Sequence, residues 1–273
     1  MERSTGKLVI EESGIFVNTK GIDMIANLKI DNTEPMDAVE DRDICVKCNK
    51  SRRYFCYSCC LPMDSIKSFL PFVRLPLKVD IIKHAKEVDG KSTSSHAAIL
   101  APNDVKLYIY PNVPDFSNEK VVLVFPNDKA LTMDKYFEKC KYSAGENLKF
   151  PFDRVVFIDS TWRQTKLILS DPRMKSLPTI CLQSHLSLFW RHQKEKPLTY
   201  LSTIEAIYYF FVDLHSISEK SEYSGQYDNL LFFFKYTFFK VREVYERKQK
   251  IRKENQVNGT LNDQLVLNDV TDE

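Results

Sequence analysis

The sequence predicts an α/β fold built on one mostly parallel sheet. Short runs of β-branched and aromatic residues alternate along the chain with stretches whose apolar residues recur at helical spacing, which is the pattern of strand–helix–strand units. Residues 121–125 are apolar throughout, as expected of a strand that is buried on both faces of a parallel sheet. At 273 residues, the chain can bury one large core, or a core and a small additional module.

Charge divides the chain into acidic ends and a basic body. Residues 1–44 hold 5 basic and 10 acidic residues, residues 45–239 hold 27 and 20, and residues 255–273 hold none and 4. A basic body is compatible with a polyanionic partner such as RNA, although ordinary surface charge gives the same balance. The predicted parts are a mostly disordered acidic arm over 1–42, a cysteine module over 43–62, a catalytic domain over 63–250 and a disordered acidic tail over 251–273.

Composition also indicates the cellular compartment of the protein. No apolar run approaches the ~20 residues of a membrane helix, so we expect no membrane partner. The first residues lack the apolar core of a signal peptide, which favours an intracellular protein. The seven cysteines are an odd number and are mostly clustered, which favours a metal site or free thiols over a disulfide framework.

Strands are expected where β-branched and aromatic residues run together or alternate with polar ones. Residues 106–110 alternate in this way, and the apolar run 121–125 ends at Pro126. Residues 155–158 are all β-branched or aromatic. The expected strands are 77–82, 106–110, 121–125, 155–158 and 179–182.

Helices are expected where apolar residues recur at helical spacing behind a capping residue. Asn127 and Asp128 can cap one such stretch, and Ser202 with Glu205 matches a capping box before another. The last helix is expected to change from aromatic to basic side chains along its length. The expected helices are 97–100, 130–137, 162–170, 206–212 and 227–250.

Four cysteines form two C-x-x-C pairs separated by seven residues, namely Cys45 with Cys48 and Cys56 with Cys59. Each pair can place two thiolates on one ion, and two pairs complete a tetrahedral site, which predicts structural zinc. Four thiolates leave no open position, so catalytic zinc is not expected. The alternatives are unmetallated buried thiols, or Cys60 in place of Cys59 as ligand.

Basic and aromatic side chains lie inside the link between the two cysteine pairs. Arg52 and Arg53 are followed there by Tyr54 and Phe55. Held on a metal-bound loop, such side chains can contact RNA phosphates and bases.

Polar residues follow the expected strand 155–158 and precede the expected helix 162–170. Asp159, Ser160 and Thr161 are all helix N-cap types, and Trp162 begins the helix. Ligands of open α/β sheets bind at the carboxyl ends of strands, where helix N–H groups are also free. This corner is therefore a candidate site; alternatively, Asp159 is only an N-cap and Trp162 only a core aromatic.

The segment Asp159-Ser160-Thr161-Trp162 resembles the D-x-T-W signature of the DTW-domain family, the tRNA-uridine aminocarboxypropyltransferases. The resemblance covers roughly residues 41–240, and it includes the paired cysteines, Phe125-Pro126 and the segments 189–193, 201–206 and 225–230. The last three segments are most similar to eukaryotic members that modify the D-loop of tRNA.

The resemblance implies transfer of the 3-amino-3-carboxypropyl group of S-adenosylmethionine (SAM) to N3 of a tRNA uridine, with the D-loop uridine at position 20 as the expected target. It also implies a nuclear location and a SPOUT-like fold that binds SAM at knotted C-terminal loops. The sequence itself limits the type of SAM-binding site, because the chain has only 7 glycines and no G-x-G-x-x-G follows an expected strand. A Rossmann-type SAM site is thus disfavoured.

Residue roles follow from the resemblance. Asp159 is expected to act as base or to orient the uridine, with Thr161 and Trp162 as the other catalytic candidates. Instead of binding SAM or RNA, Arg191 could form a surface ion pair and His192 could be an ordinary surface residue. Glu205 could cap a helix instead of binding SAM. The residues expected to bind SAM are Phe125, Pro126, Ser160, Arg191, Ser202, Thr203 and Glu205; those expected to bind RNA are Arg52, Arg53 and His192.

Two other functions fit the same residues. One is a SPOUT-type RNA methyltransferase that uses SAM, and the other is a non-catalytic, zinc-containing RNA-binding adaptor. The mass of the product separates the two reactions, and the adaptor predicts RNA affinity without turnover. The sequence leaves the oligomeric state open.

Overall fold

The computed structural model describes residues 19–140, 150–190, 197, 199–219 and 221–268. Two compact units make up the chain, Met1–Phe234 and Lys235–Glu273, and each is described by itself.

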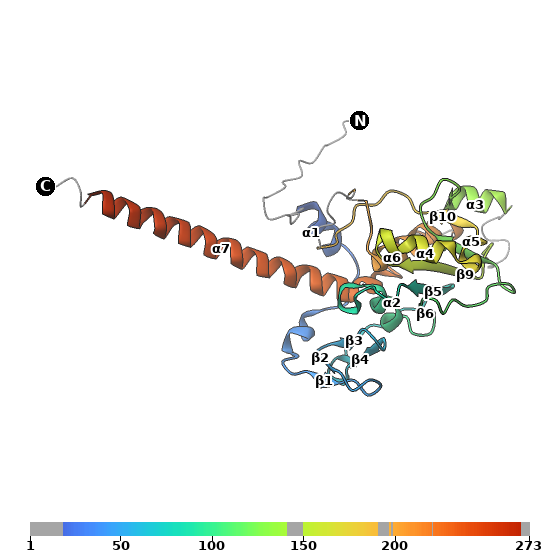
Figure 1. The fold of residues 1–273 in the computed structure, drawn as a ribbon, viewed down its shortest axis with the longest axis horizontal. Helices are drawn as coiled ribbons and strands as arrows, with labels where there is room; N and C mark the ends of the chain where they lie inside the picture. Colours follow the sequence, from blue (N-terminus) through green and yellow to red (C-terminus); the bar gives the residue numbers. More distant parts are fainter. Residues whose placement is uncertain (1–18, 141–149, 191–196, 198, 220, 269–273) are drawn as a thin grey trace. The chain divides into compact units, whose positions relative to one another are not determined.

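A six-stranded sheet forms the centre of the first unit (Figure 1). Every strand pair in it is parallel, and the strand order is β6-β5-β9-β7-β10-β8. The α/β fold with a mostly parallel sheet, predicted from the alternation of elements, is therefore confirmed. The strands are β5 (Lys78–Lys83), β6 (Val105–Ile109), β7 (Val121–Val124), β8 (Leu131–Thr132), β9 (Arg154–Asp159) and β10 (Thr179–Cys181).

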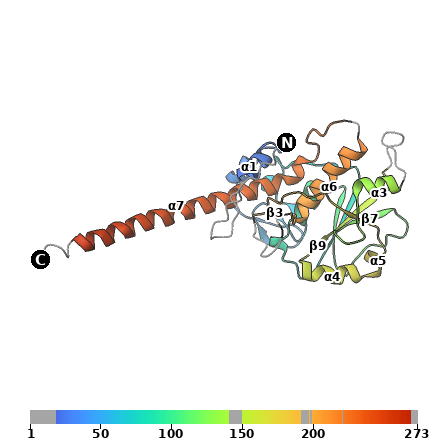
Figure 2. The ribbon, with the colours of Figure 1, turned by 90° about the horizontal axis from the view of Figure 1, so that it is seen from above.

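Helices cover both faces of this sheet (Figure 2). On one face, Val156 of β9 belongs to an apolar cluster with Ile168 and Met174. On the other face, the ring of Phe157 lies edge-on to that of Phe210, with centroids 5.8 Å apart. The covering helices are α4 (Trp162–Ser170) and α5 (Pro172–Lys175) on the first face, and α3 (Met133–Lys139) and α6 (Thr203–Ser218) on the second.

One predicted helix starts later than expected. Instead of a helix over 130–137 capped by Asn127 or Asp128, the chain forms β8 and then α3, whose N-cap is Thr132. Leu131 pairs with Ile180 of β10, so this segment is held in an extended conformation at the sheet edge. Strand pairing has overridden the helical spacing.

The predicted arm over 1–42 is ordered where the structure describes it. Helix α1 (Thr19–Ala26) and the 3-10 helix η1 (Glu34–Ala38) lie in it, and Ile25 and Met36 are buried. The expectation of a mostly disordered arm is thus wrong for 19–42, because these residues bury apolar side chains; residues 1–18 lie outside the described part.

Two short antiparallel hairpins form the cysteine module. Strands β1 (Asp43–Ile44) and β2 (Ser51–Arg52) make the first, and β3 (Phe55–Cys56) and β4 (Leu61–Pro62) make the second. Two 3-10 helices, η2 (Asp64–Ile66) and η3 (Asp89–Lys91), and helix α2 (Ser94–Leu100) follow along the chain. The ring of Phe55 lies 5.4 Å from that of His96, which joins the module to α2.

The last helix is shifted from its predicted span of 227–250. The 3-10 helix η4 (Asp228–Leu231) precedes α7 (Phe232–Asn268), whose buried Phe232, Phe233 and Phe234 belong to the first unit. The predicted disordered tail over 251–273 is helical through Asn268. Among the helices that the structure describes, none combines the length with the apolar composition that a membrane span requires.

His96 makes folding of the first unit sensitive to acid. Burial lowers the pKa of this imidazole from 6.5 to about 3, and Nδ1 has no hydrogen-bond partner among the described residues. Between pH 6.5 and pH 3, His96 is therefore protonated in the unfolded chain but not in the folded chain. As far as this group is concerned, the free energy of unfolding is highest above pH 6.5 and decreases as the pH falls towards 3. We expect a loss of about 2 kcal/mol between pH 7 and pH 5.

Urea unfolding of the wild type and of a His96→Leu variant at both pH values checks this prediction. The variant carries every other titrating group, so only the difference between the two proteins is assigned to His96. Equal pH dependence in the two proteins would contradict it.

Candidate active site at the carboxyl ends of the strands

A cavity of about 620 Å³ opens where β7, β9 and β10 end. Its volume lies within the range of small-molecule sites, and ligands of parallel sheets bind at this edge. Strand ends and two helix N-termini bring together residues that are far apart in the sequence. The predicted site residues that line it are Phe125, Pro126, Asp159, Ser160, Thr161, Trp162, Ser202 and Thr203.

The carboxylate of Asp159 is held by three hydroxyl groups. Oδ2 accepts hydrogen bonds from Ser92 Oγ at 2.6 Å and Ser94 Oγ at 2.9 Å, and Oδ1 accepts one from Thr203 Oγ1 at 2.7 Å. The residue is only 5% exposed. Of about four acceptor positions on a carboxylate, one on Oδ1 is left, and Asp159 lines the cavity.

Asp159 is not the N-cap of α4. That position belongs to Thr161, whose backbone N–H donates to Gln164 Oε1 at 3.0 Å in a capping box. The alternative interpretation of Asp159 as only a helix N-cap is therefore wrong. Its three hydroxyl partners come from other segments of the chain. The sequence pattern alone offers Ser94 only as a weak candidate and does not single out Ser92, although a run of hydroxyl residues lies between the expected strand 77–82 and the next helix.

Aromatic rings form one wall of the cavity. The ring centroid of Trp162 lies 4.6 Å from that of Tyr200 and 5.9 Å from that of Phe125. Trp162 is 39% exposed, so it is not the core aromatic of the alternative interpretation. A partly exposed indole between two rings can stack on a planar heterocycle.

Glu205 is buried and makes hydrogen bonds within the protein. Oε2 accepts from the backbone N–H and the hydroxyl of Ser202, at 2.8 and 2.6 Å, and Oε1 accepts from the N–H of Leu188 at 2.7 Å. Burial raises the pKa of this carboxyl, and these hydrogen bonds act in the opposite direction. The predicted capping box of Ser202 and Glu205 is present at the start of α6. The second oxygen of Glu205 also joins Leu188 to this helix.

Two predicted site residues lie outside the described residues. Arg191, expected to bind SAM, and His192, expected to bind RNA, fall in the segment 191–196. The knotted C-terminal loops implied by the family resemblance stay a prediction.

The four predicted cysteine ligands come together. The Sγ atoms of Cys45, Cys48, Cys56 and Cys59 all lie within 4.8 Å of one another, and those of Cys48 and Cys56 are 3.6 Å apart. Zinc–sulfur bonds of about 2.3 Å in a tetrahedron need sulfur atoms about 3.8 Å apart, so the cluster fits zinc. Cys59, rather than Cys60, completes it.

The surroundings of the cluster act in opposite directions on two of its thiols. Backbone N–H groups of Lys47 and Cys48 lower the pKa of the Cys45 thiol to about 6, whereas burial raises the pKa of the Cys59 thiol to about 12. Asn49 and Cys60, each directly after a cysteine pair, have φ of 54° and 53°, which closes a tight turn behind the pair.

The two predicted RNA-binding arginines lie on the cysteine module. The guanidinium of Arg52 lies 4.0 Å from the ring centroid of Tyr57, and that of Arg53 lies 5.2 Å from the ring centroid of Tyr54. Arg53 Nε also donates to the carbonyl of Val39 at 2.8 Å. Both side chains are therefore held over aromatic rings.

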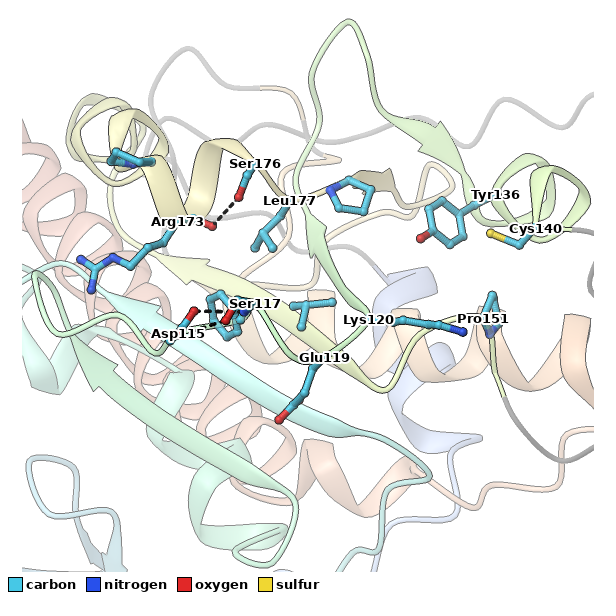
Figure 3. Close-up of a pocket in the computed structure, with 14 residues that line it drawn as sticks. Asp115, Ser117, Glu119, Lys120, Tyr136, Cys140, Pro151, Arg173, Ser176 and Leu177 are labelled. Atoms are coloured by element: carbon cyan, nitrogen blue, oxygen red, sulfur yellow. Dashed lines mark hydrogen bonds between the residues drawn. The ribbon is translucent and has the colours of Figure 1, made fainter.

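A second cavity, of about 840 Å³, lies at the amino ends of the strands, next to Lys120 and Val121 (Figure 3). Its charged groups are largely engaged with the protein. Arg173 donates to Asp171 and to two backbone carbonyls, and Glu119 accepts from Arg154. Although this cavity is larger, the one at the carboxyl ends has the constellation expected of an active site.

Comparisons with known proteins agree with the signature residues. The family model of the DTW domain matches residues 53–241. The chain is 39% identical to tRNA-uridine aminocarboxypropyltransferase 1 of Mus musculus, over 84% of this chain and 88% of the relative. Identity to the Homo sapiens protein of the same name is 37%, over 84% and 90%. No solved structure gives a significant match. The chain therefore belongs to the DTW domain family.

Proposed function

We propose that this protein transfers the 3-amino-3-carboxypropyl group of SAM to N3 of a uridine in tRNA, with the cavity beside Asp159 as its active site. The names of the relatives support tRNA-uridine modification. The observation that carries the proposal is Asp159 at the end of the central strand, fixed by Ser92, Ser94 and Thr203 inside the cavity. A D-loop uridine as target and a nuclear location belong to the same proposal.

The cavity suits a nucleoside co-substrate with polar ends. Trp162 and Phe125 offer aromatic faces to a planar base. Ser160, Ser202 and Thr203 place hydroxyl oxygens in the lining. The hydroxyls of Ser202 and Thr203 already donate to Glu205 and Asp159, and Lys91 is a cation beside the same cavity. Such a mixture of apolar walls and a few polar groups is typical of small-molecule sites. Bound SAM supplies an electrophilic carbon next to a sulfonium.

Asp159 orients a donor group of the bound substrates in this proposal. Hydrogen bonds from Ser92, Ser94 and Thr203 fix both oxygens of its carboxylate. The fixed carboxylate is better suited to positioning, and alignment of the two reactants contributes several kcal/mol to such a transfer.

The cysteine module is proposed to hold structural zinc and to bind tRNA. Arg52 and Arg53, stacked on tyrosine rings, would contact phosphates and unpaired bases.

Incubation of the purified protein with unmodified tRNA and SAM tests the proposal. We expect one uridine to gain the mass of an aminocarboxypropyl group, detected by nucleoside mass spectrometry, and no product when SAM is left out. A methylated nucleoside would favour the methyltransferase instead, and tRNA binding without any product would favour the adaptor.

A further inference from the structure

A second carboxylate lines the cavity of Asp159. Glu87 lies in the loop between β5 and η3, and it is half-buried. Its backbone N–H donates to the carbonyl of His84 at 2.9 Å, and the N–H of His84 donates to the carbonyl of Asp159 at 3.0 Å. Lys83, the last residue of β5, pairs with Asp159 in the sheet. The loop that carries Glu87 is therefore fastened to the end of β9.

The two carboxylates have different surroundings. Asp159 accepts from three side-chain hydroxyl groups, which occupy most of its acceptor positions. The carboxyl of Glu87 lies close enough to the backbone N–H of Thr161, the N-cap of α4, for that N–H to lower its pKa, and no side-chain hydroxyl group of the described residues donates to it. Glu87 can therefore take up a proton without dismantling a hydroxyl network.

The surroundings also make the carboxylate of Glu87 more basic than that of an ordinary glutamate. Burial raises the pKa of Glu87, and the negative charge of Asp159 raises it further. Lys83, the Thr161 N–H and His84 act in the opposite direction, and the net shift is upward. A base whose pKa moves towards neutrality accepts a proton more effectively near pH 7.

We propose that Glu87 is the catalytic base that removes the N3 proton of the uridine, while Asp159 orients the substrates. This assignment rests on the proposed function. Uridine N3–H is a weak acid, and N3 becomes a good nucleophile only when this proton leaves. The sequence alone does not single out Glu87, because it lies in a loop without a recognised motif.

The step balances in atoms and charge. The N3–H bond breaks as its proton passes to a carboxylate oxygen of Glu87. The electron pair left on N3 forms the new N–C bond to the aminocarboxypropyl group. The C–S bond breaks, its electron pair stays on sulfur, and neutral 5′-methylthioadenosine leaves. A carboxylate and a sulfonium are thereby converted into a neutral acid and a neutral thioether.

A Glu87→Gln variant tests the assignment. It keeps the size of the side chain and removes its basicity, so we expect kcat to fall by ~10²–10⁴-fold while KM for tRNA and SAM changes little. The rise of kcat with pH on the acid side of the wild-type profile should disappear. Glu87→Asp, which keeps a carboxylate, should recover part of the rate, and the exposed Glu222→Gln should match the wild type.

A substrate with a more acidic N3–H separates chemistry from folding. In tRNA made with 5-fluorouridine, the fluorine withdraws electrons and N3–H is lost more easily. The defect of Glu87→Gln should shrink by at least about tenfold on this tRNA. A variant that was merely misfolded would lose the same factor on both tRNAs.

The outcomes distinguish this assignment from the function on which it rests. If the wild type forms no aminocarboxypropyl-uridine, the proposed function fails, and Glu87 has no such role. If the wild type forms it and Glu87→Gln keeps its kcat, its pH profile or its full defect on 5-fluorouridine tRNA, the assignment of Glu87 alone is overturned.

Discussion

An Asp159→Asn variant is expected to stay folded and to lose activity by ~10²–10³-fold. The substitution preserves shape but replaces an acceptor oxygen by an NH₂ group. That group would face either Thr203 Oγ1 or the hydroxyls of Ser92 and Ser94, all of which now donate to the carboxylate. Loss of the charge and of a charge-assisted hydrogen bond costs about 2–4 kcal/mol in the transition state.

Initial rates of nucleoside formation, measured with thermal melting of the same protein samples, check this prediction. Ser92→Ala and Thr203→Val each remove one donor and should cause smaller losses, because the other donors still hold the carboxylate. Asp134→Asn, at an exposed position of α3, is the matched control. A folded Asp159→Asn protein with full activity would place the reaction elsewhere in the molecule.

Removal of zinc is expected to have the largest effect on stability. The cysteine module consists of two hairpins of two-residue strands, which bury little apolar surface of their own. Its buried cluster contains Cys45 and Cys56 together with Met63, the residue directly after the module, so the thiols form most of its core. Four coordinate bonds would then supply most of the folding free energy of residues 43–62.

We expect about one equivalent of zinc in the purified protein, and a loss of more than ~4 kcal/mol when a chelator removes it. Elemental analysis and denaturant unfolding measure the two quantities. Cys48→Ser should reproduce the effect, whereas the exposed Cys140→Ser should not, since Cys140 lies outside the cluster. Protein without zinc and with unchanged stability would favour the alternative of unmetallated thiols.

The module is also connected to the active-site loop. Ser58 Oγ donates to Asp89 Oδ2 at 2.6 Å, and the other oxygen of Asp89 pairs with the buried Lys83. Asp89 begins η3, which directly precedes Ser92, the donor to Asp159. Loss of zinc is therefore expected to lower activity as well as stability.

Local features of the site could be read from the sequence. The strand before Asp159, the helix that begins at Trp162, the capping box at Ser202 and the two cysteine pairs all depend on neighbouring residues. Hydrophobic period, capping chemistry and ligand spacing act over a few residues, so a single sequence contains them.

Tertiary contacts decided the rest. The donors to Asp159 are 67, 65 and 44 residues away from it in the sequence. The backbone N–H of Lys29 donates to the carboxylate of Asp228, which is 199 residues away. Periodicity indicates which side chains are buried, but not which loops meet at a sheet edge. The sequence by itself determined the strand, the turn and the helix around Asp159, and it determined the thiol pairs. Only the packed sheet brought Ser92, Ser94 and Thr203 to Asp159 and placed Glu87 in the same cavity as Asp159, because strand order and loop closure depend on contacts across the whole chain.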